Sequence, residues 1–139
     1  MDIMKKLLTE TFKFAITGVI GFMVDTLVLY LLKGLTGLYG ARLISFSCAV
    51  ITTWLINRSL TFAATPSQHG KHKEFATYFL IMCVGGAVNL ACYSGLIAVS
   101  PLTRHYPVLA IAAGSLIGMF FNFSLSKALL YHGKAGKSG

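Results

Sequence analysis

Two basic residues stand inside otherwise apolar stretches, and their surroundings repeat. Arg58 and Lys127 are 69 positions apart, and each has an aromatic residue four positions before it and another four positions after it. At about 3.6 residues per turn, these positions share one face of a helix. A guanidinium group suits phosphate oxygens, so the pattern predicts a site for an anionic headgroup. The aromatic residues are Trp54 and Phe62 around Arg58, and Phe123 and Tyr131 around Lys127; we expect Trp54, Phe62 and Tyr131 to line the site.

The same residues also have purely structural interpretations. Arg58 and Lys127 lie about one turn inside a helix end, roughly 6 Å, so both side chains could simply extend to the lipid headgroups. Trp54 could pack on a neighbouring helix. A polar residue precedes each cation, however, Asn57 in one case and Ser126 in the other. This matched arrangement favours a binding site.

A carboxylate lies much deeper in the first apolar stretch. Asp25 is about eleven residues past the inner boundary, roughly 16 Å, which is close to the bilayer midplane. Asn89 falls at a similar depth further along the chain. Ionisable groups at this depth are costly unless they face protein, water or a partner, so Asp25 is a functional candidate. The alternatives are that Asp25 is protonated or hydrogen-bonded and only joins helices, and that the Asn89 amide bridges helices.

The composition is that of a membrane protein. The chain has 139 residues, of which 55% are hydrophobic and only 12% charged, whereas soluble proteins average about a quarter charged. The net charge of +8 comes from Lys and Arg placed between apolar runs, so anionic lipids are the expected counter-charge and nucleic acid is not. The three cysteines lack metal-ligand spacing, and we expect no metal and no cofactor.

Four segments are long enough to span a bilayer, which takes roughly 20 apolar residues for about 30 Å of hydrocarbon. We predict an all-α membrane protein with helices at residues 14–32, 41–62, 75–100 and 108–131. The first two helices form one pair (14–62) and the last two another (75–131). The remaining segments are a basic N-terminal segment (1–13), which could begin a short helix on the membrane surface, a polar loop (63–74) and a basic tail (132–139).

Charge bias and internal repetition predict the topology. Nine Lys and Arg residues fall on one side and three on the other, which places both termini and the polar loop in the cytoplasm. A shift of 64 residues aligns Gly21 with Gly85 and Asp25 with Asn89. Since both halves begin inside, they form two parallel two-helix repeats about an axis along the membrane normal. Four short helices can hardly enclose a pathway alone, so we expect a homodimer or a complex.

Several motifs together resemble the GtrA-like family of four-helix membrane proteins, over about residues 12–131. They are Phe14-x3-Gly18-x2-Gly21-x2-Val24-Asp25, Ala41-Arg42-x3-Phe46, Trp54-x2-Asn57-Arg58-x2-Thr61-Phe62 and Asn122-Phe123-x3-Lys127. The second half departs from the family pattern, with Met82 in place of a glycine and Ser126 in place of an asparagine.

The resemblance implies a protein of lipid-linked sugar pathways in the bacterial inner membrane. Such proteins are thought to move a polyprenyl-phosphate monosaccharide, for example undecaprenyl-phosphate glucose, from the cytoplasmic to the outer leaflet, often beside a membrane glycosyltransferase. Arg58 and Lys127 would then bind the lipid phosphate. The expected polar seam for the sugar hydroxyls comprises Asp25, Asn57, Asn89 and Asn122.

Two functions from other classes stay open. A small proton-coupled multidrug exporter also has four helices and an intramembrane carboxylate, for which Asp25 would serve. A non-transporting membrane partner of a glycosyltransferase would need no substrate site. We expect no enzymatic activity and no catalytic residues, because no nucleophile, base and orienting group occur at suitable spacing.

Overall fold

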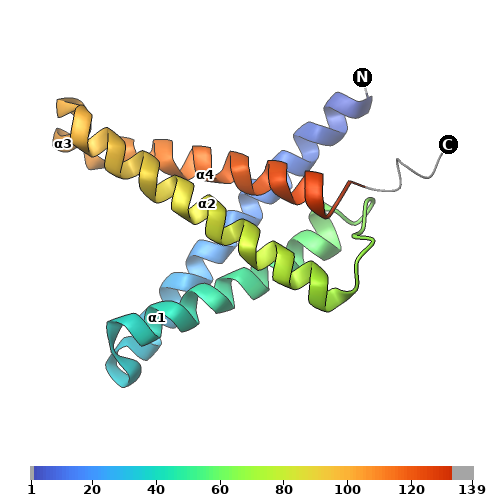
Figure 1. Ribbon diagram of the computed structural model, residues 1–139, viewed down its shortest axis with the longest axis horizontal. Coiled ribbons are helices and arrows are strands. Elements are labelled where there is room, and N and C mark those ends of the chain that lie inside the picture. Colours follow the sequence, from blue (N-terminus) through green and yellow to red (C-terminus); the bar gives the residue numbers. More distant parts are fainter. Residues whose placement is uncertain (1, 133–139) are drawn as a thin grey trace. The chain divides into compact units, whose positions relative to one another are not determined.

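The computed structural model describes residues 2–132, which are helical apart from short connections and form no strand (Figure 1). Within this range four helices are long and apolar enough to cross a membrane: Asp2–Gly37, Gly40–Thr61, Lys71–Val99 and Pro107–Leu129. The prediction of an all-α protein with four membrane-spanning helices is confirmed. Most of the expected tail, residues 133–139, lies outside the described residues. The described chain divides into two compact units, residues 2–68 and 69–132.

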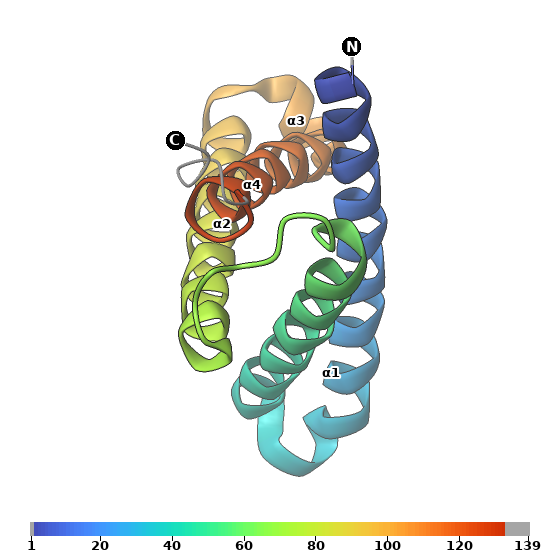
Figure 2. The same ribbon diagram turned by 90° about the vertical axis from the view of Figure 1, so that its right-hand side faces the viewer.

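The first unit is a helical hairpin made by α1 (Asp2–Ile56). The helix doubles back at Gly37, whose φ of 78° and ψ of 171° fall in a region that favours glycine (Figure 2). The first arm starts at Asp2 and spans 36 residues. Residues 2–13 of the predicted basic segment therefore belong to this helix and do not form a separate surface helix. At 1.5 Å per residue the arm is about 54 Å long, which exceeds the roughly 30 Å of hydrocarbon. The second arm ends in a π-helical turn, η1 (Asn57–Thr61).

The second unit is a hairpin of two packed helices, α2 (Lys71–Val99) and α4 (Pro107–Leu129), joined by the single turn α3 (Pro101–His105). Ser100 caps α3, because its side chain accepts a hydrogen bond from the Thr103 backbone N–H. The Arg104 guanidinium donates to the carbonyls of Ile97 and Ala98, at 2.9 Å each. These bonds satisfy carbonyl groups that the end of α2 leaves without helical partners.

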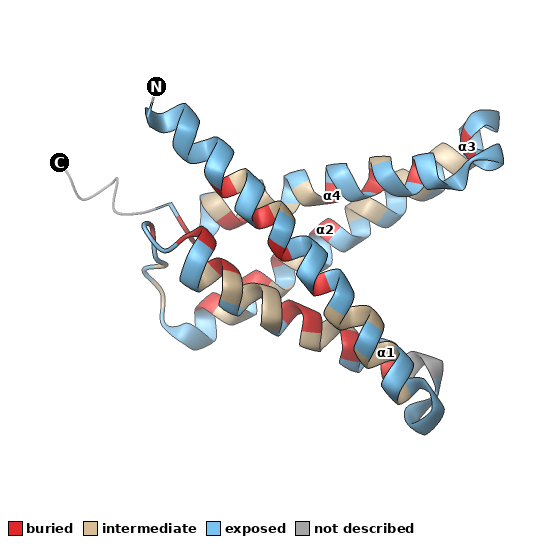
Figure 3. Ribbon diagram, turned by 180° about the vertical axis from the view of Figure 1, so that it is seen from behind, coloured by how far each residue is buried: buried red, intermediate tan, exposed pale blue. Residues whose placement is uncertain are grey.

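Most of the surface of each helix is exposed, and much of that surface is apolar (Figure 3). Phe22, Leu35 and Phe120 are 69%, 80% and 64% exposed. In water such a surface would be an aggregation hazard, whereas lipid tails solvate it. Together with the four apolar helices, this surface is that of a multi-pass membrane protein.

Candidate functional site

A widened helical turn lies at each of the two predicted cations. In the first half the Phe62 N–H donates to the Asn57 carbonyl, five residues back, at 2.8 Å. In the second half the Tyr131 N–H donates to the Ser126 carbonyl at 2.9 Å, again five residues back. The first turn is a π-helix, a rare element that often occurs at functional sites. In the second half the Ser126 carbonyl also accepts from the Leu130 N–H at 2.9 Å, so this bond closes the end of α4. The residues that directly follow the two acceptors are the predicted phosphate ligands, Arg58 and Lys127.

In the first half the helical stripe places three predicted residues at the same end of the hairpin. The guanidinium carbon of Arg58 lies 5.8 Å from the centre of the Trp54 ring, a cation–π distance. Phe62 is fully buried and tilts against Phe14, with 6.0 Å between ring centroids. Phe62 therefore closes the hairpin core, whereas Trp54 supports the cation.

Asn57 stabilises the widened turn from within. Its side chain is 1% exposed, and its Oδ1 accepts a hydrogen bond from the Thr61 hydroxyl at 2.8 Å. Because this bond links the first and last residues of η1, it holds the turn that carries Arg58. A contact between Asn57 and a sugar stays a prediction.

The equivalent end of the second half contains a buried polar bond. The Tyr131 hydroxyl donates to Glu74 Oε2 at 2.6 Å, and both residues are 0% exposed. The distance is typical of a hydroxyl on a carboxylate. Glu74 lies in the first turn of α2, so the bond ties the start of α2 to Tyr131, two residues past the end of α4. Tyr131, expected as an aromatic lining, thus also acts through its hydroxyl.

Glu74 has a buried counterpart that the sequence motifs did not reveal. The shift of 64 residues that aligns Gly21 with Gly85 also aligns Glu10 with Glu74. Glu10 is 4% exposed. Both glutamates fall in stretches that the sequence suggested to be polar flanks. Extending the repeat by eleven residues towards the N-terminus would have identified them.

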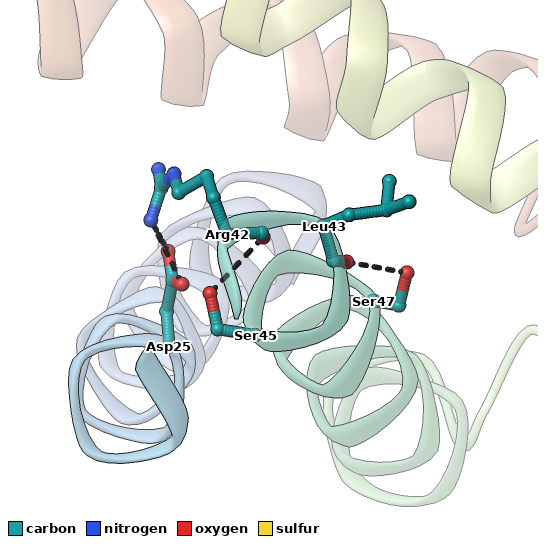
Figure 4. A network of polar contacts seen from close by, with 5 residues as sticks. All are labelled: Asp25, Arg42, Leu43, Ser45 and Ser47. Carbon is teal, nitrogen blue, oxygen red and sulfur yellow. Dashed lines mark hydrogen bonds and ion pairs between the residues drawn. The ribbon is translucent and has the colours of Figure 1, made fainter. Parts of the chain in front are cut away.

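Asp25 forms an ion pair within the first hairpin (Figure 4). One guanidinium nitrogen of Arg42 donates to both carboxylate oxygens, at 2.9 Å and 2.8 Å. The Asp25 side chain is 15% exposed and that of Arg42 59%. The sequence indicated Arg42 only as part of a family motif, so this partner was missed. The pair joins the two arms, as the structural alternative for Asp25 expected; its contact with a sugar stays a prediction.

Asp25 and Arg58 do not form one site in the first half. Arg58 belongs to the end marked by the Phe14–Phe62 contact. Asp25 follows Phe14 by eleven residues on the same arm, about 16 Å further along the helix axis. The hairpin therefore carries two separate polar places, one at its open end and one deeper inside.

The two predicted asparagines of the second half lie where α2 and α4 come close. A Cβ added to Gly85 would overlap the Asn122 amide, and one added to Gly114 would lie 2.5 Å from Asn89 Oδ1. The glycines thus make room for the amides, as small residues do between membrane helices. Asn89 and Asn122 fill the helix contact, and their roles in sugar binding stay predictions.

A comparison with protein families decides the assignment. The model of the family described as GtrA/DPMS, transmembrane domain, matches residues 13–131. The chain belongs to the GtrA/DPMS family. The match confirms the resemblance to GtrA-like proteins that the sequence motifs indicated. A search of curated proteins found no match.

Membership of the GtrA/DPMS family narrows the function. It connects this multi-pass membrane protein with polyprenyl-phosphate sugars and with the glycosyltransferases that handle them. The matched region begins three residues after Glu10 and ends at Tyr131. It therefore includes both widened turns, the Asp25–Arg42 pair and the glycine–asparagine contacts.

Proposed function

We propose that this GtrA/DPMS protein moves a polyprenyl-phosphate-linked monosaccharide from the cytoplasmic to the outer leaflet of the bacterial inner membrane. Arg58 and Lys127, each in its own half, bind the lipid phosphate. Both termini and the loop between the halves face the cytoplasm, because most Lys and Arg residues of the chain lie on that side of the membrane. The polyprenyl tail stays in the lipid during transport.

The observation that carries this proposal is the pair of matched hydrogen bonds across five residues, each with a cation directly after its acceptor residue. In the first half, Arg58 stands beside the Trp54 ring, and a cation–π contact is compatible with hydrogen bonds from the five N–H donors of arginine. Phosphate oxygens are bound through such N–H groups. In a family connected with polyprenyl-phosphate sugars, this arrangement supports phosphate binding better than simple contact with headgroups.

The decisive experiment measures transport of polyprenyl-phosphate glucose in proteoliposomes. We expect Arg58→Ala to lower the initial rate at least about tenfold, since a charged hydrogen-bond partner contributes roughly 1.5–3 kcal/mol. Arg58→Lys should recover only part of the rate, because an ammonium lacks the planar fork. Lys33→Ala, which removes one charge near the Gly37 bend, serves as the matched control. Wild-type transport by Arg58→Ala would contradict the phosphate role.

A second function is favoured by the family description itself, which names a transmembrane domain. A chain made of such a domain can serve as the membrane partner of a separate glycosyltransferase without transporting lipid. In that case Arg58→Ala would leave glycosylation intact, and substitutions in the polar loop at residues 63–70 would disrupt co-purification with the transferase. Purification in mild detergent would also measure the oligomer that we propose, a homodimer.

The structure offers no support for a proton-coupled drug exporter. Its essential carboxylate would be Asp25, which is held by both oxygens in an ion pair with Arg42. Proton-dependent efflux of cationic dyes by the purified protein would contradict this view.

A further inference from the structure

An open-mouthed surface cavity of about 370 Å³ lies in the first half, between the start of α1 and the end of η1. This volume lies within the range of roughly 300–1,000 Å³ found for ligand sites. The α1 wall carries Lys5, Lys6, Glu10 and Lys13. Lys6, Glu10 and Lys13 are separated by four and three residues and Lys5 is next to Lys6, so these positions share one broad helix face. The opposite wall includes Thr61, the last residue of the turn that begins with Asn57 and Arg58.

The cavity combines a cationic rim with a buried acid. The three lysines are exposed, whereas Glu10 is 4% exposed. Two hydroxyl groups also line it, and both already donate: Thr9 to the Lys5 carbonyl and Thr61 to Asn57 Oδ1, each at 2.8 Å. The hydroxyl oxygens therefore present acceptors to a ligand. The site offers ammonium donors at its mouth and oxygen acceptors inside.

We propose that this cavity binds a phosphorylated sugar headgroup, with lysines on the phosphate and Glu10 on the sugar hydroxyls. Ammonium groups bind phosphate oxygens, and a carboxylate accepts hydrogen bonds from hydroxyls, so one site satisfies both ends of such a molecule. Binding of a simple anion would not account for the buried carboxylate in the lining of the cavity. The inference rests on the proposed function and extends its site from Arg58 to residues that begin the chain's first helix.

The second half lacks this combination at the matched positions. The shift of 64 residues replaces Lys5, Lys6 and Lys13 with His69, Gly70 and Thr77. An oxygen of Glu74, the counterpart of Glu10, is occupied by the Tyr131 hydroxyl. In the first half the residue equivalent to Tyr131 is Phe62, which has no hydroxyl. Among the described residues, the three lysines of the cavity wall therefore have no basic counterparts at the matched positions of the second half.

The first test is binding of radiolabelled glucose 1-phosphate to the full chain in nanodiscs of zwitterionic lipid, measured by equilibrium dialysis. We expect Lys5→Ala with Lys6→Ala to weaken binding at least about tenfold, because charged hydrogen bonds are lost. Lys71→Ala with Lys73→Ala removes the same charge from exposed positions of the second half and should change affinity less than about twofold. Equal losses in both double variants would overturn the proposal.

The second test separates the sugar from the phosphate. Glu10→Gln should weaken glucose 1-phosphate about tenfold and leave inorganic phosphate unchanged, whereas the lysine variant weakens both. Glu10→Asp keeps the carboxylate, so its affinity for glucose 1-phosphate should lie between those of the wild type and Glu10→Gln. It replaces Glu10→Gln in this test if that variant fails to fold. Equal effects of Glu10→Gln on both probes would overturn the sugar contact. Displacement of the probe by phosphatidylglycerol added to the nanodiscs would identify an ordinary lipid headgroup as the ligand and overturn it too.

Binding and transport can fail separately. A wild-type protein that binds glucose 1-phosphate but moves no lipid-linked sugar contradicts the proposed transport and leaves the cavity assignment in place. Full transport by the variant with Lys5→Ala and Lys6→Ala contradicts the cavity assignment and leaves the transport proposal in place.

Discussion

The two hairpins share their packing but differ in their charges. In both halves a glycine of one helix faces a side chain of the other, and a widened turn follows the second helix. Buried aromatic residues, all at most 5% exposed, occupy matched places. The matched pairs are Gly21–Thr53 with Gly85–Asn122, and Phe14–Phe62 with Tyr78–Tyr131.

The polar residues inside this shared frame differ. The first half holds the Asp25–Arg42 ion pair, where the repeat places Asn89 and Ile111 in the second. The second half instead bonds its buried acid to the Tyr131 hydroxyl. The comparison teaches that helix contacts constrain the apolar and small residues more tightly than the charged ones. The first half carries an ion pair and a lysine-lined cavity, whereas the matched positions of the second half are mostly uncharged.

The largest effect should come from a side chain added to the glycine seam of the second half. A Cβ at Gly114 would lie 2.8 Å from the Asn89 backbone oxygen, which cannot rotate away. We expect Gly114→Ala to lower the free energy of unfolding by about 3 kcal/mol through overpacking. Denaturation by SDS in mixed micelles, followed by circular dichroism, measures this loss.

The controls for this substitution come from the same chain. A Cβ at Gly86 meets nothing within 4 Å, so Gly86→Ala should be neutral or stabilise by about 0.5–1 kcal/mol through helix propensity. The first half already carries a side chain at the matched position, Ser45. Equal stability of Gly114→Ala and the wild type would show that the two seams are equally tolerant.

An intermediate effect is expected when Tyr131 of the second half is replaced by phenylalanine, the residue type at the matched position of the first half, Phe62. Tyr131→Phe removes the donor to buried Glu74 and should destabilise the fold by about 2 kcal/mol. Exposed Tyr106 is the control, since Tyr106→Phe should change stability by less than about 0.5 kcal/mol. A double-mutant cycle with Glu74→Gln isolates the bond. A coupling energy near zero would refute its structural role.

The smallest effect concerns the ion pair of the first half. Arg42→Ile leaves the Asp25 carboxylate without its partner and should cost about 1 kcal/mol, discounted because the Arg42 side chain is 59% exposed. Adding Asp25→Asn recreates the neutral residues of the second half and should restore most of the loss. The same unfolding assay applies. If the double variant is less stable than Arg42→Ile alone, the two halves do not have interchangeable polar residues.

The sequence predicted the features that follow from hydropathy and repetition. The spans are visible because a nearly uncharged apolar run of about 20 residues is the length that crosses a bilayer, and the repeat exposed the matched cations. Helix limits were less accurate: the first helix begins at Asp2, not at residue 14, because lysines favour the headgroup region without ending a helix. The sequence did not show which of the neighbouring glycines, Gly34, Gly37 or Gly40, forms the bend.

Contacts between residues that are far apart in the sequence were harder to predict. Asp25 was identified, but its partner Arg42 depends on where the hairpin turns and on how far a long side chain reaches. Glu10 and Glu74 were missed because charged residues near helix ends usually face water. The widened turns were missed for another reason: one extra residue in a turn leaves almost no trace in a pattern of apolar positions.

The two widened turns also bear on the history of the chain. A π turn corresponds to an α-helix that has gained one residue. The bonds from Phe62 to Asn57 and from Tyr131 to Ser126 occupy the same place in the two repeats. Duplication of one hairpin that already ended in such a bond accounts for its presence in both repeats.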